Sequence, residues 1–98
     1  MTITKKADGT SLAVYLEGRL DTTTAPQLDA ELVNSLQGVT DLILDLEKLD
    51  YISSAGLRVL LSAHKKMLKQ GSMVVRNVNE DIMDVFDVTG FSDLFTIE

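Results

Sequence analysis

Short apolar segments alternate along this chain with longer amphipathic segments, and this alternation constrains the fold more than any other feature. Leucine, isoleucine and valine gather in runs that are long enough for a strand but too short for a buried helix. Between the runs, apolar residues recur every three or four positions, which is the periodicity of a helix with one buried face. Strands that alternate with helices form α/β domains, so we expect a mixed sheet with helices packed on it.

The pattern predicts five strands and three helices in the order β-β-α-β-α-β-α-β. The strands are Met1–Lys6, Ser11–Glu17, Leu42–Leu46 with an extended continuation over Leu49–Ile52, Met73–Val75 and Leu94–Ile97. The helices begin at the capping-box pattern Thr24–Gln27, near Ser54 and after Asn79, and end near Gly38, Gln70 and Gly90. The turn signal Asp8-Gly9 predicts that the first two strands are antiparallel neighbours, and Gly18–Thr23 is expected to be a loop.

The same periodicities predict which side chains are buried. The first helix should present Leu28, Leu32 and Leu36, with Ala25 and Val33 beside them. The second should present Leu57, Leu60, Leu61, His64 and either Met67 or Leu68. The nearly continuous apolar run Leu42–Leu46 is typical of a central strand that is covered on both faces. At the end of the third helix, Phe91 is expected to pack back on Phe86.

Length and charge narrow the range of functions. A chain of 98 residues is expected to form a single domain, residues 1–98. A net charge of -6 argues against binding to nucleic acid and to an anionic membrane surface. The absence of cysteine excludes disulfides and thiolate chemistry. The first residues do not resemble a signal peptide, and no apolar segment is long enough to span a membrane, so a cytoplasmic location is expected.

The sequence offers little support for an enzyme, a metal site or a cofactor. It contains neither a G-x-S-x-G elbow nor a Walker A motif. His64 falls on the core-facing stripe of the second helix, roughly 15 Å along the helix from Ser54, and is expected to be a packing residue. Three carboxylates, those of Asp21, Asp45 and Asp50, could gather at one end of the sheet around a cation, although caps and solvated loops explain them more simply.

The most informative segment is Asp50–Leu61, which passes from a strand to a helix without a long loop. In open α/β sheets, functional groups gather at the carboxyl ends of the strands. A serine at this position is a natural helix N-cap. Gly56, in the first helical turn, costs roughly 1 kcal/mol relative to alanine. Close approach by another backbone or by a partner would explain the glycine, and Ser53–Gly56 would form an uncluttered helix end within reach of a kinase.

This junction and three other motifs resemble the STAS-domain anti-sigma-factor antagonists, and the resemblance covers nearly the whole chain. The segment Ser53-Ser54-Ala55-Gly56-Leu57 is similar to the family signature. It stands between a predicted strand and a predicted amphipathic helix. The other matching segments are Gly18–Asp21, Leu44–Leu46 and Phe86–Phe91. The chain departs from the family where Ser53 replaces an aspartate and Ala55 replaces a hydroxyl residue.

The resemblance implies a partner-switching regulator rather than an enzyme. Ser54 matches the regulatory serine, which a dedicated serine kinase, itself the anti-sigma factor, would phosphorylate. A PP2C-type phosphatase would remove the phosphate, and the unphosphorylated protein would bind the anti-sigma factor. We expect the partner to contact the residues around this serine, namely Asp21, Thr22, Ser53, Ser54, Gly56, Leu57 and Arg58.

Two alternatives remain open on the sequence. In the first, the chain is a non-phosphorylated STAS scaffold or a transport-accessory subunit, and Ser54 is only a helix cap. In the second, the chain is a small enzyme or a nucleotide-binding protein. Phosphorylation of the wild-type protein, but not of a Ser54→Ala variant, would separate the leading hypothesis from the first alternative, and a turnover assay would test the second.

Overall fold

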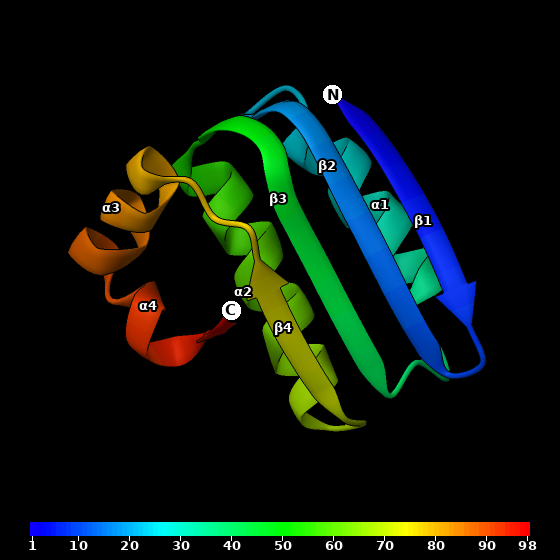
Figure 1. Cartoon of the computed structure of the whole chain (residues 1–98). Coiled ribbons are helices and arrows are strands. Elements are labelled where there is room, and N and C mark those ends of the chain that lie inside the picture. Colours follow the sequence, from blue (N-terminus) through cyan, green and yellow to red (C-terminus); the bar gives the residue numbers. More distant parts are fainter.

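A five-stranded sheet forms the centre of the computed structural model, which describes all of residues 1–98 (Figure 1). The strands lie in sequence order across the sheet and are β1 (Thr2–Asp8), β2 (Ser11–Leu20), β3 (Asp41–Ile52), β4 (Ser72–Arg76) and β5 (Thr96–Ile97). β1 pairs with β2 in antiparallel fashion, and the remaining neighbours are parallel. The predicted mixed α/β sheet and the predicted hairpin are therefore confirmed.

Four helices accompany the sheet: α1 (Ala25–Ser35), α2 (Ser54–Leu68), α3 (Glu80–Thr89) and the short α4 (Phe91–Leu94). Figure 1 shows α1 and α2 behind the sheet, while the opposite face of β1 to β4 carries no helix. The prediction that β3 is covered on both faces was therefore wrong. Leu42, Leu44 and Leu46 are buried on the helical side, whereas Ile43 on the open side is only half-buried. None of the helices has the length and apolar character needed to cross a membrane.

The core is one cluster of 24 buried residues between the helices and the sheet. Each of the stripe residues Leu28, Leu32 and Leu36 is buried, as predicted. Three positions on the helices depart from the predicted stripes or settle a choice that the sequence left open. Leu61, which was expected to be buried, is only half-buried. Val33 is 59% exposed, and Met67 rather than Leu68 enters the core.

The C-terminal segment differs most from its prediction. The expected strand Leu94–Ile97 is divided between α4 and the two-residue strand β5. The aromatic ring pairs here are formed by Phe95, whose ring centroid lies 5.3 Å from that of Phe91 and 5.7 Å from that of Phe86. Phe91 packs against the core cluster that contains Phe86. The third helix starts and stops as predicted, because the Asn79 side chain accepts a hydrogen bond from the backbone N–H of Ile82 and Gly90 adopts a left-handed conformation.

Candidate functional site

The candidate site is built where β2 and β3 end together. β2 continues as a strand to Leu20, beyond the loop start predicted at Gly18, and Leu20 pairs with Ile52 of β3. One residue further on, the backbone N–H of Ser53 donates to the carbonyl of Leu20 over 2.9 Å. This parallel pairing brings the loop after β2, which contains Asp21 and Thr22, beside the start of α2. The expectation that these residues share one end of the sheet is confirmed.

The two serines at this junction have different roles. Ser53 is the N-cap of α2: its backbone is extended, and its hydroxyl accepts a hydrogen bond from the backbone N–H of Gly56 over 3.4 Å. Ser54 is the first helical residue, and its side chain is exposed. The capping task that a serine was expected to perform therefore belongs to Ser53. The hydroxyl of Ser54 takes part in none of the side-chain hydrogen bonds of the structure, so no contact within the chain engages it.

Gly56 and Leu57, which we expected to contact a partner, are turned inward. A Cβ atom on Gly56 would lie 2.6 Å from Cγ of Leu20 and 3.0 Å from Cγ1 of Ile52. The close approach that explains this glycine therefore comes from the protein's own core. Leu57 is only 6% exposed. These two residues shape the base of the site, while its accessible surface comes from their neighbours.

Asp21 organises the turn before α1. Its carboxylate accepts hydrogen bonds from the Thr23 hydroxyl (2.7 Å) and from the backbone N–H groups of Thr23 (3.0 Å) and Thr24 (3.1 Å). The bond from the Thr23 hydroxyl contributes most, and together these bonds outweigh partial burial and lower the pKa of Asp21. The predicted capping box at Thr24 was wrong, because Thr24 has helical backbone angles and makes no side-chain cap.

An open groove runs between α1 and α2 at the same end of the molecule. It is lined by Thr22, Ala25, Pro26, Asp29, Ala55, Arg58, Val59 and Ser62. Arg58 is exposed, and its Nε donates to the backbone carbonyl of Ser54 at 3.5 Å. The expectation that Arg58 projects outward from the helix is therefore confirmed.

Sequence reasoning missed one pair of residues at this end. The guanidinium of Arg19 lies 4.2 Å from the ring centroid of Tyr51, and the two residues are paired across β2 and β3. Arg19 also lies 3.8 Å from Asp21. Only the strand register could have revealed this stack, because the two residues are far apart in the chain.

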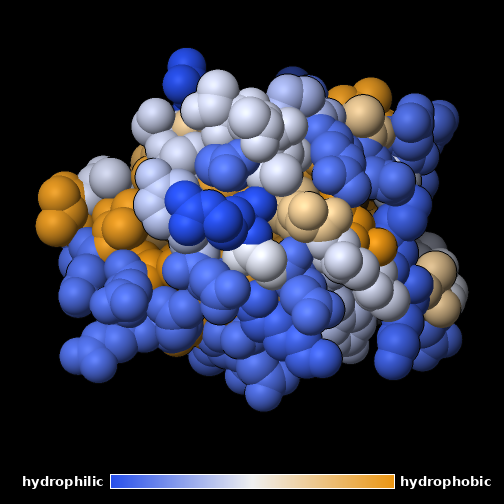
Figure 2. Space-filling model, turned by 90° about the horizontal axis from the view of Figure 1, so that it is seen from above, coloured by the Kyte–Doolittle hydropathy of each residue, from blue (hydrophilic) through white to orange (hydrophobic).

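Figure 2 looks on to the end of the molecule that is uppermost in Figure 1, where β2 and β3 finish. Near-neutral surface lies around the centre of this face beside strongly hydrophilic surface, and hydrophobic surface is broken into small areas.

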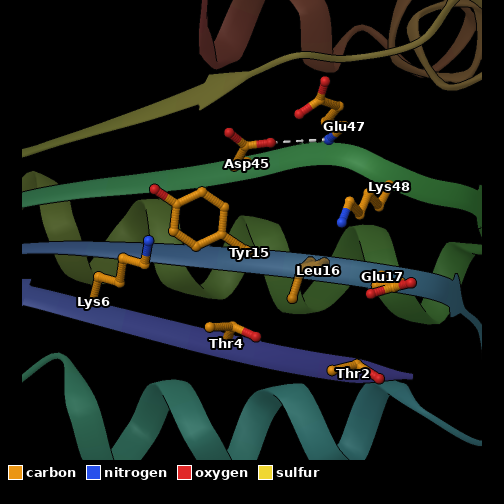
Figure 3. Close-up of a pocket in the computed structure, with 9 residues that line it drawn as sticks. All are labelled: Thr2, Thr4, Lys6, Tyr15, Leu16, Glu17, Asp45, Glu47 and Lys48. Atoms are coloured by element: carbon orange, nitrogen blue, oxygen red, sulfur yellow. Dashed lines mark hydrogen bonds between the residues drawn. The ribbon is translucent and has the colours of Figure 1, made fainter.

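A second hollow lies on the open face of the sheet (Figure 3). Its lining residues are Thr2, Thr4, Lys6, Tyr15, Leu16, Glu17, Asp45, Glu47 and Lys48. Lysines and carboxylates are mixed in this lining, so it favours neither an anion nor a cation.

The residues that sequence reasoning weighed for chemistry have structural partners. Asp45 is buried, receives a hydrogen bond from the backbone N–H of Glu47 and pairs with Arg76 at 3.0 Å. It therefore does not join Asp21 in a cluster. His64 is half-buried and packs edge-on against Phe95, with ring centroids 5.5 Å apart. The expectation that His64 is a packing residue is confirmed.

The protein family of the chain follows from its similarity to known proteins. Residues 2–98 match the STAS domain family, and the chain belongs to that family. It is 39% identical over 94 residues to BtrV of Bordetella bronchiseptica, a proposed anti-sigma factor antagonist, and covers 80% of that protein. It is 32% identical over 93 residues to the anti-sigma-B factor antagonist of Bacillus subtilis and covers 85% of it. In both comparisons 94% of this chain is covered.

The fold is shared with solved structures. The Bacillus cell fate determinant SpoIIAA in its phosphorylated form superposes with a TM-score of 0.77 at 20% identity. The match covers 99% of this chain and 91% of SpoIIAA. The predicted resemblance to STAS-domain proteins is confirmed.

Proposed function

We propose that this chain is an anti-sigma-factor antagonist that works by partner switching. With Ser54 unphosphorylated, it binds an anti-sigma factor that is also a serine kinase; phosphorylation of Ser54 releases it, and a PP2C-type phosphatase restores binding. The chain acts as a single cytoplasmic STAS domain spanning residues 1–98, as a binding module rather than an enzyme. The names of its relatives support the partner class.

The observation that carries this proposal is that Ser53 caps α2, whereas the Ser54 side chain has no structural role. Because Ser53 satisfies the helix end, the hydroxyl of Ser54 can be modified without removing a cap. The exposed side chain of Ser54 is accessible to a kinase. The docking surface around it is formed by Asp21, Thr22, Ser53 and Arg58.

The switch is electrostatic. A phosphate adds about -1.5 to -2 charges at neutral pH. At a helix N-terminus the backbone N–H groups and the helix dipole favour an anion, so the fold should tolerate the modification. A bound partner would have to desolvate that charge or face it. A loss of about 3–4 kcal/mol of binding free energy would weaken affinity by about two to three decades.

The first test is phosphorylation by the purified anti-sigma-factor kinase of the same organism with ATP. We expect phosphate on the wild-type protein and on Ser53→Ala, and none on Ser54→Ala. Phosphate on Ser54→Ala would place the modification elsewhere. Absence of phosphate on all three proteins would favour the alternative of a non-phosphorylated scaffold or transport-accessory subunit.

The second test measures partner affinity by titration calorimetry. We expect Ser54→Glu to weaken binding about 100-fold, because the added carboxylate is placed within the interface. Asn34→Glu, which adds the same charge at an exposed position near the other end of α1, is the control and should leave affinity within about twofold. Equal effects of the two variants would contradict a local switch at Ser54.

A further inference from the structure

Arg58 differs from the other two arginines in having no carboxylate partner. The ion pairs of the structure are Lys5–Glu31, Arg19–Asp21 and Arg76–Asp45. Arg58 belongs to none of them, although it is exposed beside the site. Its one side-chain hydrogen bond, at 3.5 Å, goes to the backbone carbonyl of Ser54. A positive charge with no fixed partner is therefore held next to the proposed phosphorylation site.

The helix geometry directs this charge toward the Ser54 side chain. Residues four apart lie on the same face of a helix. Long side chains in helices bend back toward the N-terminus, so the side chain of Arg58 covers the turn that begins at Ser54. The contact of its Nε with the Ser54 carbonyl is consistent with this direction. A phosphate on the Ser54 hydroxyl would extend from that same turn.

We infer that Arg58 binds the phosphate of Ser54 within the same chain and thereby reports the phosphorylation state to the partner. This inference rests on the proposed phosphorylation of Ser54. A guanidinium can donate two parallel hydrogen bonds to a phosphate, which a point charge cannot do as well. In the unphosphorylated protein the guanidinium is available to a carboxylate on the partner. Phosphorylation therefore adds a negative charge and removes a positive contact in one step.

No other cation competes for this role at the groove. Arg19 is already engaged with the Tyr51 ring and Asp21. The other ionisable residue that lines the groove is Asp29 of α1, whose carboxylate would repel a phosphate. Arg58 and the backbone N–H groups of the first turn are thus the groups that can stabilise the anion.

The inference can be tested without a kinase or a partner. Phosphoserine is incorporated at residue 54 during translation, and its second ionisation is followed by 31P NMR as a function of pH. We expect the phosphate pKa to be lower in the wild-type background than in Arg58→Gln by about 0.15–0.4 units. Arg58→Lys should fall between them, because it keeps the charge and loses the two-pronged geometry.

Lys65→Gln is the matched control, since it removes one positive charge from an exposed position of the same helix. It lies seven residues beyond Arg58, or about 10 Å along the axis. We expect it to leave the phosphate pKa unchanged. Equal pKa values in the wild-type and Arg58→Gln proteins, or equal shifts in Arg58→Gln and Lys65→Gln, would overturn the inference.

A binding measurement separates this inference from the proposed function. With the anti-sigma factor, Arg58→Gln should weaken the unphosphorylated complex about 10-fold and shrink the effect of phosphorylation. If phosphorylation releases the partner equally well from wild type and Arg58→Gln, the inference fails and the proposed function stands. If no kinase modifies Ser54 while the NMR shift is observed, the proposed function fails and the phosphate contact stands.

Discussion

At the scale of single residues, two adjacent serines perform separate tasks because their backbones differ. Ser53 has an extended backbone with φ -99° and ψ 175°, which directs its hydroxyl toward the N–H of Gly56. Ser54 already lies within the helix. A hydroxyl that caps a helix contributes to folding, whereas a hydroxyl at the first helical position contributes little. Under the proposed function, helix capping and phosphorylation would therefore use different hydroxyl groups.

This division predicts unequal effects on stability. Ser53→Ala should lower the free energy of unfolding by about 1 kcal/mol, because the N–H of Gly56 loses its acceptor. Ser54→Ala should change it by less than about 0.5 kcal/mol, as is usual for an exposed position without contacts. Urea denaturation followed by circular dichroism measures both. A larger loss in Ser54→Ala than in Ser53→Ala would mean that the capping assignment is reversed.

At the scale of secondary structure, the site depends on how closely α2 approaches the ends of β2 and β3. Gly56 is buried in the first turn, where its missing side chain leaves room for Leu20 and Ile52. This packing allows the first turn of α2 to lie close to the ends of β2 and β3. Ser54 is exposed on the same helical turn, whose inner side Gly56 packs against the strand ends.

Gly56→Ala should destabilise the protein by about 1–3 kcal/mol, because the added methyl group overlaps Leu20 in a packed core. At an exposed helical position the same change would be stabilising by roughly 1 kcal/mol, so the sign of the effect is diagnostic. Thermal and urea unfolding supply the measurement. Ser62→Ala, at an exposed position of the same helix, is the control and should be nearly neutral. A more stable Gly56→Ala protein would show that the first turn is not packed as described.

At the scale of the whole molecule, a polar cluster joins three strands on the open face of the sheet. Asp45 of β3 pairs with Arg76 of β4, and the Asn77 side chain donates to the same carboxylate oxygen over 3.0 Å. Arg76 also donates to the hydroxyl of Tyr15 on β2 at 3.4 Å. Burial alone would raise the pKa of Asp45, but the hydrogen bonds from Glu47, Arg76 and Asn77 outweigh it and lower the pKa.

The lowered pKa predicts how stability responds to acid. The contribution of Asp45 is complete above the unfolded-state pKa of about 3.9 and is lost as the pH falls through the lower folded-state value. Asp45→Asn should lower the free energy of unfolding at pH 7 by about 2 kcal/mol, less than for a fully buried pair because the Arg76 side chain is 36% exposed.

Urea denaturation between pH 2 and pH 7 tests this prediction. The wild-type curve should fall more steeply in acid than that of Asp45→Asn, so that the two curves converge at low pH. Asp21, whose pKa is also lowered, remains in both proteins and does not affect their difference. Parallel curves would show that the charged form of Asp45 does not stabilise the folded protein.

Local signals determined much of this protein. The order of strands and helices, the stripe Leu28–Leu32–Leu36, the cap at Asn79 and the stop at Gly90 all follow from residues within a few positions of one another. Such features are set by side-chain periodicity and by backbone preferences of single residues. The direct passage from β3 into α2 at Ser53 and Ser54 was also predictable, because small residues between a strand and a helix form a recognisable motif.

Only the tertiary structure determined which distant residues are in contact. The pairing of Leu20 with Ile52 brings Asp21 beside α2, stacks Arg19 on Tyr51 and makes the core, rather than a partner, the reason for Gly56. On the open face of the sheet, Asp45 likewise pairs with Arg76, which lies 31 residues further along the chain. These contacts depend on strand register, and a shift of one residue would turn every side chain to the other face. The packing of the whole core fixes the strand register, so no short segment of the sequence predicts it.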